Sequence, residues 1–156
     1  MRLTLAVLHL VALGLGLYAV IVRGTALREA TRTTPADASL RTAFRADAAW
    51  GIAAMLWIAT GLWRLFAATE KPTTYYMHNH LFMAKMGLLV LILVLELSPM
   101  LTLIRWRRAR AAGTDAATLV QGSVAGRIAI ISHVQALLVV AMIVCASAMA
   151  RGYGSR

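Results

Sequence analysis

Two ionisable side chains stand deep inside one apolar run of this 156-residue sequence. Lys85 and Glu96 both belong to the apolar run 77–104, and eleven positions separate them. At about 100° per residue, that separation is three turns plus roughly 20°, so both side chains lie on one face of a helix. His78, seven residues before Lys85, falls on the same face. A charge in hydrocarbon is costly unless it is paired or hydrated, so this face is predicted to look into a protein interior.

The composition is typical of a membrane protein. Hydrophobic residues make up 60% of the chain and charged residues only 14%. Four apolar runs, 3–22, 46–68, 77–104 and 124–150, each reach the roughly 20 residues needed to cross ~30 Å of hydrocarbon. Little chain remains for a soluble domain, so residues 1–156 are predicted to form a single all-α domain, an integral membrane antiparallel four-helix bundle.

The segments between the runs are predicted to be connections. Residues 23–45 are polar and contain Pro35, which indicates a loop with a short helix around Leu40. Residues 69–74 indicate a short turn, and residues 105–121 a basic helix end followed by a loop. Pro99, inside the third run, is predicted to kink its helix.

The net charge of +10 does not indicate nucleic-acid binding, because the basic residues cluster at the ends of the apolar runs. Ten of them lie in or beside the first and third connections, and five on the opposite side. The ten are Arg23, Arg28, Arg32, Arg41, Arg45, Arg105, Arg107, Arg108, Arg110 and Arg127, and the five are Arg2, Arg64, Lys71, Arg151 and Arg156. This bias predicts that both termini lie outside and that both long loops lie in the cytoplasm.

Counting residues from the outer end of each helix, at about 1.5 Å each, sorts the buried polar groups into layers. His9 and Lys85 share a layer in the outer half, below a mouth where His78 and His80 lie. No carboxylate falls at that depth, so the Lys85 ammonium needs another acceptor or an anion. This layer is predicted to be a ligand site that opens outward.

The inner half is predicted to hold two polar pairs. Glu96 and His133 have matching depths and are expected to face each other. Asp47 and Arg127 lie closer to the inner boundary and are expected to form an ion pair. A pair of this kind is more often structural than part of a proton relay, and a lone histidine in a span more often bonds a neighbouring helix than a ligand.

The order of several short motifs resembles one family. The motifs are Ala-Asp-Ala-Ala-Trp-Gly at 46–51, Thr-Gly-Leu-Trp-Arg at 60–64, Tyr-Tyr-Met-His-Asn-His-Leu-Phe-Met-Ala-Lys at 75–85, Leu-Glu-Leu-Ser-Pro-Met at 95–100 and Ile-Ser-His-Val-Gln at 131–135. They resemble the bacterial predicted membrane proteins grouped as domain of unknown function 2214, nearly from end to end. The resemblance implies a four-span inner-membrane protein and assigns no activity.

A more distant likeness is to the HemJ-type protoporphyrinogen oxidases, which are small haem-binding membrane bundles. His9 matches a histidine early in a span, and Lys85 matches a later lysine in the aromatic-x-x-Lys context of Phe82-Met-Ala-Lys85. The arginine-rich and Trp-Leu-His signatures of that family are missing here, so its catalytic activity is not carried over. The likeness implies haem b as a cofactor, with His9 as the candidate ligand of the iron.

Three hypotheses about function follow. In the first, the chain binds haem or another tetrapyrrole for a redox or cofactor-handling role, with His9, Lys85, His78 and His80 around the ligand. In the second, His9, Lys85, Glu96 and His133 form a relay in a small transporter or proton-conducting bundle. In the third, the chain is a non-catalytic assembly subunit. Membrane lipids are the expected surroundings in all three, and the transporter reading requires a homodimer or a larger complex.

Overall fold

The computed structural model describes residues 2–67 and 78–154, and this part of the chain is almost entirely helical. It contains four long helices: α1 (Arg2–Ala30), α2 (Asp37–Phe66), α4 (His80–Ala111) and α6 (Val124–Ala150). A short helix, α5 (Ala116–Val120), lies between α4 and α6. Each long helix is long and apolar enough to cross a membrane. The all-α fold and the four predicted spans are therefore confirmed, and the chain is a multi-pass membrane protein.

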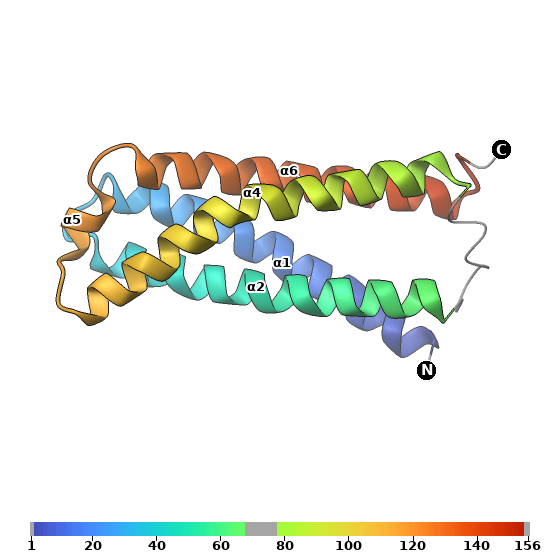
Figure 1. Cartoon of the computed structure of the whole chain (residues 1–156), viewed down its shortest axis with the longest axis horizontal. Coiled ribbons are helices and arrows are strands. Elements are labelled where there is room, and N and C mark those ends of the chain that lie inside the picture. Colours follow the sequence, from blue (N-terminus) through green and yellow to red (C-terminus); the bar gives the residue numbers. More distant parts are fainter. Residues whose placement is uncertain (1, 68–77, 155–156) are drawn as a thin grey trace.

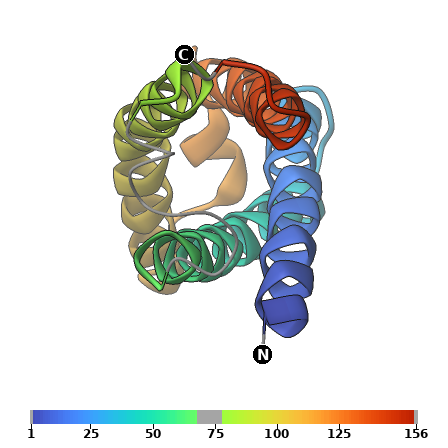
Figure 2. The ribbon, with the colours of Figure 1, turned by 90° about the vertical axis from the view of Figure 1, so that its right-hand side faces the viewer.

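The four long helices run up and down in turn. Figure 1 shows both chain termini at one end of the bundle and α5 at the other. We call these the terminal end and the α5 end. Helix α1 packs closely on α2 and α6, and α4 packs on α6, whereas α2 and α4 make few contacts. Figure 2, viewed from the terminal end, shows the long helices arranged as a ring.

The prediction of a loop over residues 23–45 is wrong. Helix α1 continues to Ala30 and α2 begins at Asp37, so only six residues connect them. The reason is an apolar core at the α5 end, in which Leu27, Leu40 and Trp106 are buried together with many alanines. The arginines between these positions face outward and gave the segment its polar composition, but the buried residues recur at helical spacing.

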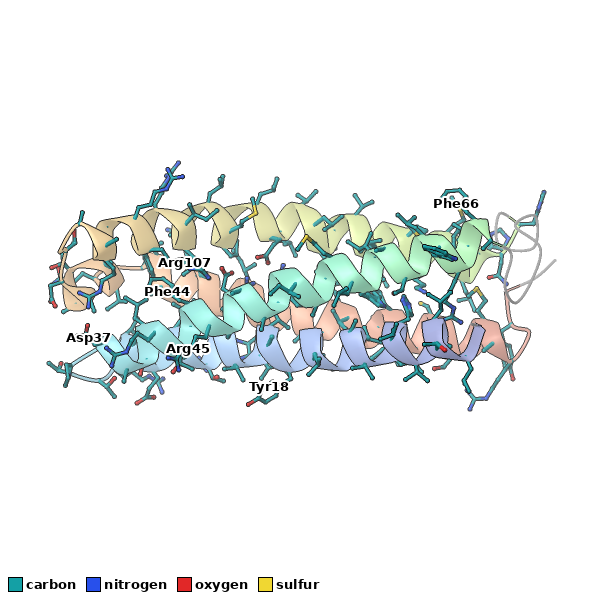
Figure 3. The ribbon with its side chains drawn as sticks, turned by 90° about the horizontal axis from the view of Figure 1, so that it is seen from below. Tyr18, Asp37, Phe44, Arg45, Phe66 and Arg107 are labelled. Carbon is teal, nitrogen blue, oxygen red and sulfur yellow. The ribbon has the colours of Figure 1, made fainter. Side chains whose placement is uncertain are left out.

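The helices extend beyond the hydrocarbon. At 1.5 Å per residue, the 29 to 32 residues of α1, α2 and α4 span roughly 45 Å, against ~30 Å of hydrocarbon. The surplus explains the buried core beneath α5, which resembles that of a soluble protein. Along the spans, apolar side chains face outward instead: Leu15, Tyr18, Val94 and Leu137 are all exposed, and Figure 3 shows Tyr18 pointing away from the bundle.

Pro99 lies inside α4, as the sequence predicted. Its ring nitrogen cannot donate the hydrogen bond of a regular helix, which favours a bend. Figure 1 shows α4 bending so that its last part lies near the beginning of α2. The ion pair between Arg110 of α4 and Asp37 of α2 joins the two helices there.

The chain end folds back on the beginning of α4. The side chain of Asn79 accepts hydrogen bonds from the backbone nitrogens of Leu81 at 2.9 Å and Phe82 at 3.3 Å, and so caps the helix. The same amide donates to the carbonyl of Tyr153 at 3.2 Å, and the backbone nitrogen of His80 donates to the carbonyl of Gly154 at 3.1 Å. These bonds fasten α6 to α4 at the terminal end. The turn predicted at residues 69–74 lies outside the described residues.

Candidate functional site

Arg23 of α1 is fully buried and uses every N–H group of its guanidinium. Nε donates to Ser132 Oγ at 3.0 Å, Nη1 to Asp47 Oδ1 at 2.9 Å and to Glu96 Oε1 at 2.7 Å, and Nη2 to Glu96 Oε2 at 2.9 Å and to Gln135 Oε1 at 2.8 Å. These partners come from α2, α4 and α6, so a single side chain joins all four long helices. The contact with Glu96 is bidentate, which is the strongest arrangement available to this pair.

The partners of Arg23 are themselves satisfied. Asp47 accepts a second bond, at Oδ2, from Nη2 of Arg107 at 2.8 Å. Gln135 donates to Glu96 Oε2 at 2.9 Å and to the carbonyl of Ile92 at 3.2 Å. We call Arg23, Asp47, Glu96, Arg107, Ser132 and Gln135 the Arg23 network. Its two guanidinium groups and two carboxylates give a net charge of zero, which makes burial of this many charges tolerable.

Arg107 closes the network toward the α5 end. Its guanidinium lies 5.4 Å from the centre of the Phe44 ring, and Nη2 also donates to the carbonyl of Phe44 at 2.6 Å. Figure 3 shows Arg107 of α4 beside Phe44 of α2. The side chain of Arg107 keeps 37% of its surface exposed, against 0% for Arg23. The network therefore runs from the partly exposed Arg107 to the fully buried Arg23.

The Arg23 network lies between two apolar clusters. On its α5 side stands the core that contains Leu27, Leu40 and Leu103. On its other side, one helical turn away on α1, α2 and α4, stand Val20, Trp50 and Ile92. Val139 and Met142 of α6 belong to this second cluster. We call the second cluster the central apolar layer, and it separates the Arg23 network from the terminal half of the bundle.

The two pairs predicted for the inner half are not formed. Glu96 bonds Arg23 and Gln135, whereas Nδ1 of His133 donates to the carbonyl of Ala129 at 2.6 Å. Because a carbonyl can only accept, this bond fixes the proton on Nδ1. Depth along an axis does not determine the side of a helix that a residue occupies: His133 lies about 160° around α6 from Gln135, and it faces α1.

Asp47 pairs with Arg23 and Arg107 in place of the predicted Arg127. Arg127 precedes Ser132 by five residues, which places it about 140° away around α6. Its side chain is exposed, as expected for a cation at the polar boundary of a membrane. As for His133, depth along the helix axis did not determine which side of α6 the residue occupies.

A cavity of about 500 Å³ lies in the terminal half, between all four long helices. Its wall is mostly apolar, with Leu10 and Leu13 from α1, Phe82 from α4 and Ile143 from α6. Ionisable side chains also line it: His9 from α1, Arg64 from α2 and Lys85 from α4. The structure therefore brings His9 and Lys85 into the wall of one cavity. Its volume falls within the range of small-molecule sites.

Contacts with α2 hold His9 in place. Nδ1 lies 2.9 Å from Oγ1 of Thr60, and the ring stacks on Trp57 with centroids 5.7 Å apart. The Thr60 hydroxyl donates to the carbonyl of Leu56 at 2.7 Å, so it accepts the proton of Nδ1. In neutral His9 the lone pair is then on Nε2. A bond of this kind on the opposite ring nitrogen is what orients histidines that bind metals.

Lys85 has no hydrogen bond or ion pair within the described part of the chain. Its side chain is only partly exposed, and a second cation, Arg64, lines the same cavity. No aspartate or glutamate is among the described lining residues. Nε1 of Trp57 is also buried without a hydrogen-bond partner in the described structure. The cavity thus offers donors and positive charge to a ligand that supplies acceptors.

The other two histidines predicted for this site lie outside it. His78 and His80 are exposed near the beginning of α4, and neither is among the described residues that line the cavity. The structure leaves His9 as the histidine of the cavity wall.

Sequence reasoning missed the centre of the network and one cation of the cavity. Arg23 was grouped with the loop, although it follows Gly16 by seven residues and so lies on the same helix face as the small residues Ala12 and Gly16. Arg64 was counted among the basic residues that indicate the orientation. The helical period, carried past the last apolar residue, is the signal that identifies Arg23.

Comparison with known proteins supports the same description. No curated protein and no solved structure matches the chain. The family described as "Predicted membrane protein (DUF2214)" matches residues 1–154. With four membrane-spanning helices and a match over nearly its whole length, the chain belongs to this family of predicted membrane proteins.

Proposed function

We propose that the protein binds an amphipathic anion of the membrane phase in the cavity of its terminal half. The observation that supports this most directly is Lys85, an ammonium without a described partner in the wall of a mostly apolar cavity. Burying an unpaired charge is costly, and the charge is retained at low cost only when a partner neutralises it. A ligand with an apolar body and an acidic edge satisfies both the wall and the cation.

Haem b, or another tetrapyrrole, is the specific candidate ligand. The residues present fit such a group: His9 contributes an imidazole held by the bond between its Nδ1 and Thr60, and Met142 adds a thioether to the wall. Lys85 and Arg64 would hold the propionate carboxylates. A haem bound here would supply one-electron redox chemistry.

The orientation and the membrane belong to this proposal. With both termini outside, the cavity faces the outer side of the bacterial inner membrane and the Arg23 network lies in the inner half. The outward-facing apolar side chains contact lipid. A homodimer or a larger complex stays a prediction.

The test is an absorption spectrum of the whole protein, expressed with haem available and purified with its native lipids. We expect a porphyrin band in the wild-type protein, lost in His9→Ala and weakened in Lys85→Gln. The matched controls are His80→Ala and Arg151→Gln, which change an exposed histidine and an exposed cation away from the cavity wall.

Two outcomes would contradict parts of the proposal. A wild-type protein without a porphyrin band would remove haem as the ligand. Lipid extracts of the purified protein, analysed by mass spectrometry, then decide the broader proposal: an anionic amphiphile should be enriched with the wild-type protein and depleted with Lys85→Gln. Equal extracts from both proteins would mean that the cavity does not bind an anion.

A further inference from the structure

Helix α1 diverges from α6 at the terminal end. Figures 1 and 2 show the first turns of α1 away from the end of α6, whereas its later turns lie beside α6. Burial follows the same course: the first buried residue of α1 is Ala12, and the last buried residue of α6 is Met142. Among the described side chains of these two helices, none nearer the terminal end is buried. The cavity reaches into this looser part of the bundle.

Three residues of the cavity wall are also exposed: Leu10 of α1, and Ser147 and Ala150 of α6. Leu10 keeps 62% of its surface exposed. A residue that lines a cavity and is itself exposed marks the place where the cavity meets its surroundings. The described wall residues from α2 and α4 are all buried or half-buried. The cavity therefore opens sideways between α1 and α6, and we call the place marked by Leu10, Ser147 and Ala150 the lateral opening.

The helix surfaces on both sides of the lateral opening are apolar. Val7 and Val11 of α1 and Val144 of α6 are exposed there. Residues 3–22 and 128–150 contain no aspartate, glutamate, lysine or arginine. Helix surfaces of this composition contact lipid chains and not water. The lateral opening therefore leads into the bilayer.

We propose that the ligand of the cavity passes directly between the bilayer and the cavity through the lateral opening. This deepens the proposed function and rests on it, because it assigns a route to the anion that binds beside Lys85. It also assigns the class of ligand: a molecule that is already dissolved among lipid chains when it meets the protein. A ligand whose acidic edge reaches Lys85 of α4 keeps its apolar body toward α1 and α6, where the wall offers Leu10 and Ile143.

The side of the bundle between α2 and α4 is the alternative route. These two helices make few contacts with each other, so their joint is also loose. However, the described wall residues that they contribute, such as Gly61 and Phe82, are not exposed. The experiment therefore has to distinguish the two sides.

The rates at which a ligand enters and leaves are the quantities to measure. The test variant is Leu10→Cys in the full chain with Cys145→Ser, since Cys145 is the single native cysteine and is not among the described wall residues. A bulky aromatic thiosulfonate is attached to the new thiol in detergent, and the protein is then reconstituted in phosphatidylcholine nanodiscs. A thiol reductant removes the label, so each preparation also serves as its own control. Ser147→Cys is a second variant on the opposite rim.

Two further labelled variants serve as matched controls. Val11→Cys is exposed on α1 beside Leu10 but is not among the described wall residues. Met83→Cys is exposed on α4 near the cavity and tests the side between α2 and α4. The probes are haem, followed by its porphyrin band, and cis-parinarate, a single-chain carboxylate followed by its fluorescence. Both are supplied from phosphatidylcholine vesicles.

The label at Leu10→Cys or Ser147→Cys should slow association and dissociation by the same factor, about tenfold or more, for whichever probe binds. The dissociation constant should stay the same, because it is the ratio of the two rates and the label obstructs the route in both directions. Both rates should recover when the reductant removes the label. The labels at Val11→Cys and Met83→Cys should change neither rate. Lys85→Gln should instead weaken the affinity, because it removes the cation at the binding site.

The failures of this inference and of the proposed function are distinguishable. If binding depends on Lys85 and the labels at Leu10→Cys and Ser147→Cys slow neither rate, the route is wrong while the anion site stands. If the label at Met83→Cys slows both rates, the ligand passes between α2 and α4 and the lateral opening is not its route. A label at Leu10→Cys that lowers the affinity without slowing association would also contradict the route. If neither haem nor parinarate binds, both proposals fail together.

Discussion

The backbone of Gly24 in α1 lies against the imidazole ring of His133 in α6. A Cβ added to Gly24 would stand 2.7 Å from Cε1 and 2.9 Å from Nδ1 of the imidazole, closer than atoms of these types approach in proteins. The ring cannot swing away freely, because Nδ1 is bonded to the carbonyl of Ala129. Gly24 follows Arg23 directly, so this contact sets the depth at which the Arg23 guanidinium enters the bundle.

Replacing Gly24 by alanine should destabilise the protein although alanine is the better helix former. The added methyl group forces α1 away from α6, at a cost of about 1–3 kcal/mol that is partly offset by the ~1 kcal/mol gain in helix propensity. The measurement is thermal unfolding of the purified protein in one detergent. Gly14→Ala is the control: a Cβ there meets nothing within 4 Å, so stability should hold or rise. The Gly24→Ala effect should shrink in a His133→Ala background, and an undiminished effect would mean that the ring is not the obstacle.

Removing the Arg23 side chain should be among the most damaging single changes. Arg23→Met removes the cation of the network that pairs with Glu96 and leaves Asp47 with Arg107, and breaking a buried pair from one side costs about 3–5 kcal/mol. We expect little folded protein after extraction, or a large loss of thermal stability. The double variant Arg23→Met with Glu96→Gln should recover part of the loss, because it removes an uncompensated charge. Arg28→Met changes an exposed arginine further along α1 and should have almost no effect on stability.

Reporter fusions should place both termini outside the cytoplasm. Arg23 no longer counts toward the bias of basic residues, because it is buried in a neutral network. Nine basic residues then remain on the α5 side against five on the terminal side, and the rule of cytoplasmic positive charge still points the same way. A periplasm-active reporter should work at the C-terminus. A fusion at residue 113, between α4 and α5, should be active only with a cytoplasmic reporter, and the reverse pattern would overturn the orientation.

The protein alone should not conduct protons through its centre. The central apolar layer, with Val20, Trp50 and Ile92, lies between the Arg23 network and the cavity that holds His9 and Lys85. Proteoliposomes with an imposed pH gradient should lose it no faster than protein-free vesicles. A positive control is Val20→Glu, which introduces an ionisable group into the layer. Rapid flux with the wild-type protein, abolished by Glu96→Gln, would restore the relay hypothesis.

The fold was accessible from the sequence because apolar length and charge clustering depend on local composition alone. The shared layer of His9 and Lys85 followed from counting residues along each axis, and the structure places both in the wall of one cavity. Predicting which side chains contact each other also requires the rotation of each helix about its axis and the identity of the neighbouring helices. Depth alone led to the prediction that Glu96 pairs with His133. The burial of Arg23 was not predicted for a related reason. Its charge suggested the end of a span, whereas the packing of Leu27 and Ala30 extends the helix past it.

The neutrality of the Arg23 network has an electrical consequence. A transmembrane potential does work of about 2.3 kcal/mol on each elementary charge moved through 100 mV. Two guanidinium groups and two carboxylates that move together experience opposing forces of equal size, so the potential neither pulls the network toward one side nor opposes its displacement. The part of the bundle that holds the Arg23 network is therefore insensitive to the energised state of the membrane. The Lys85 ammonium in the cavity wall would gain the same insensitivity only while an anion is bound beside it.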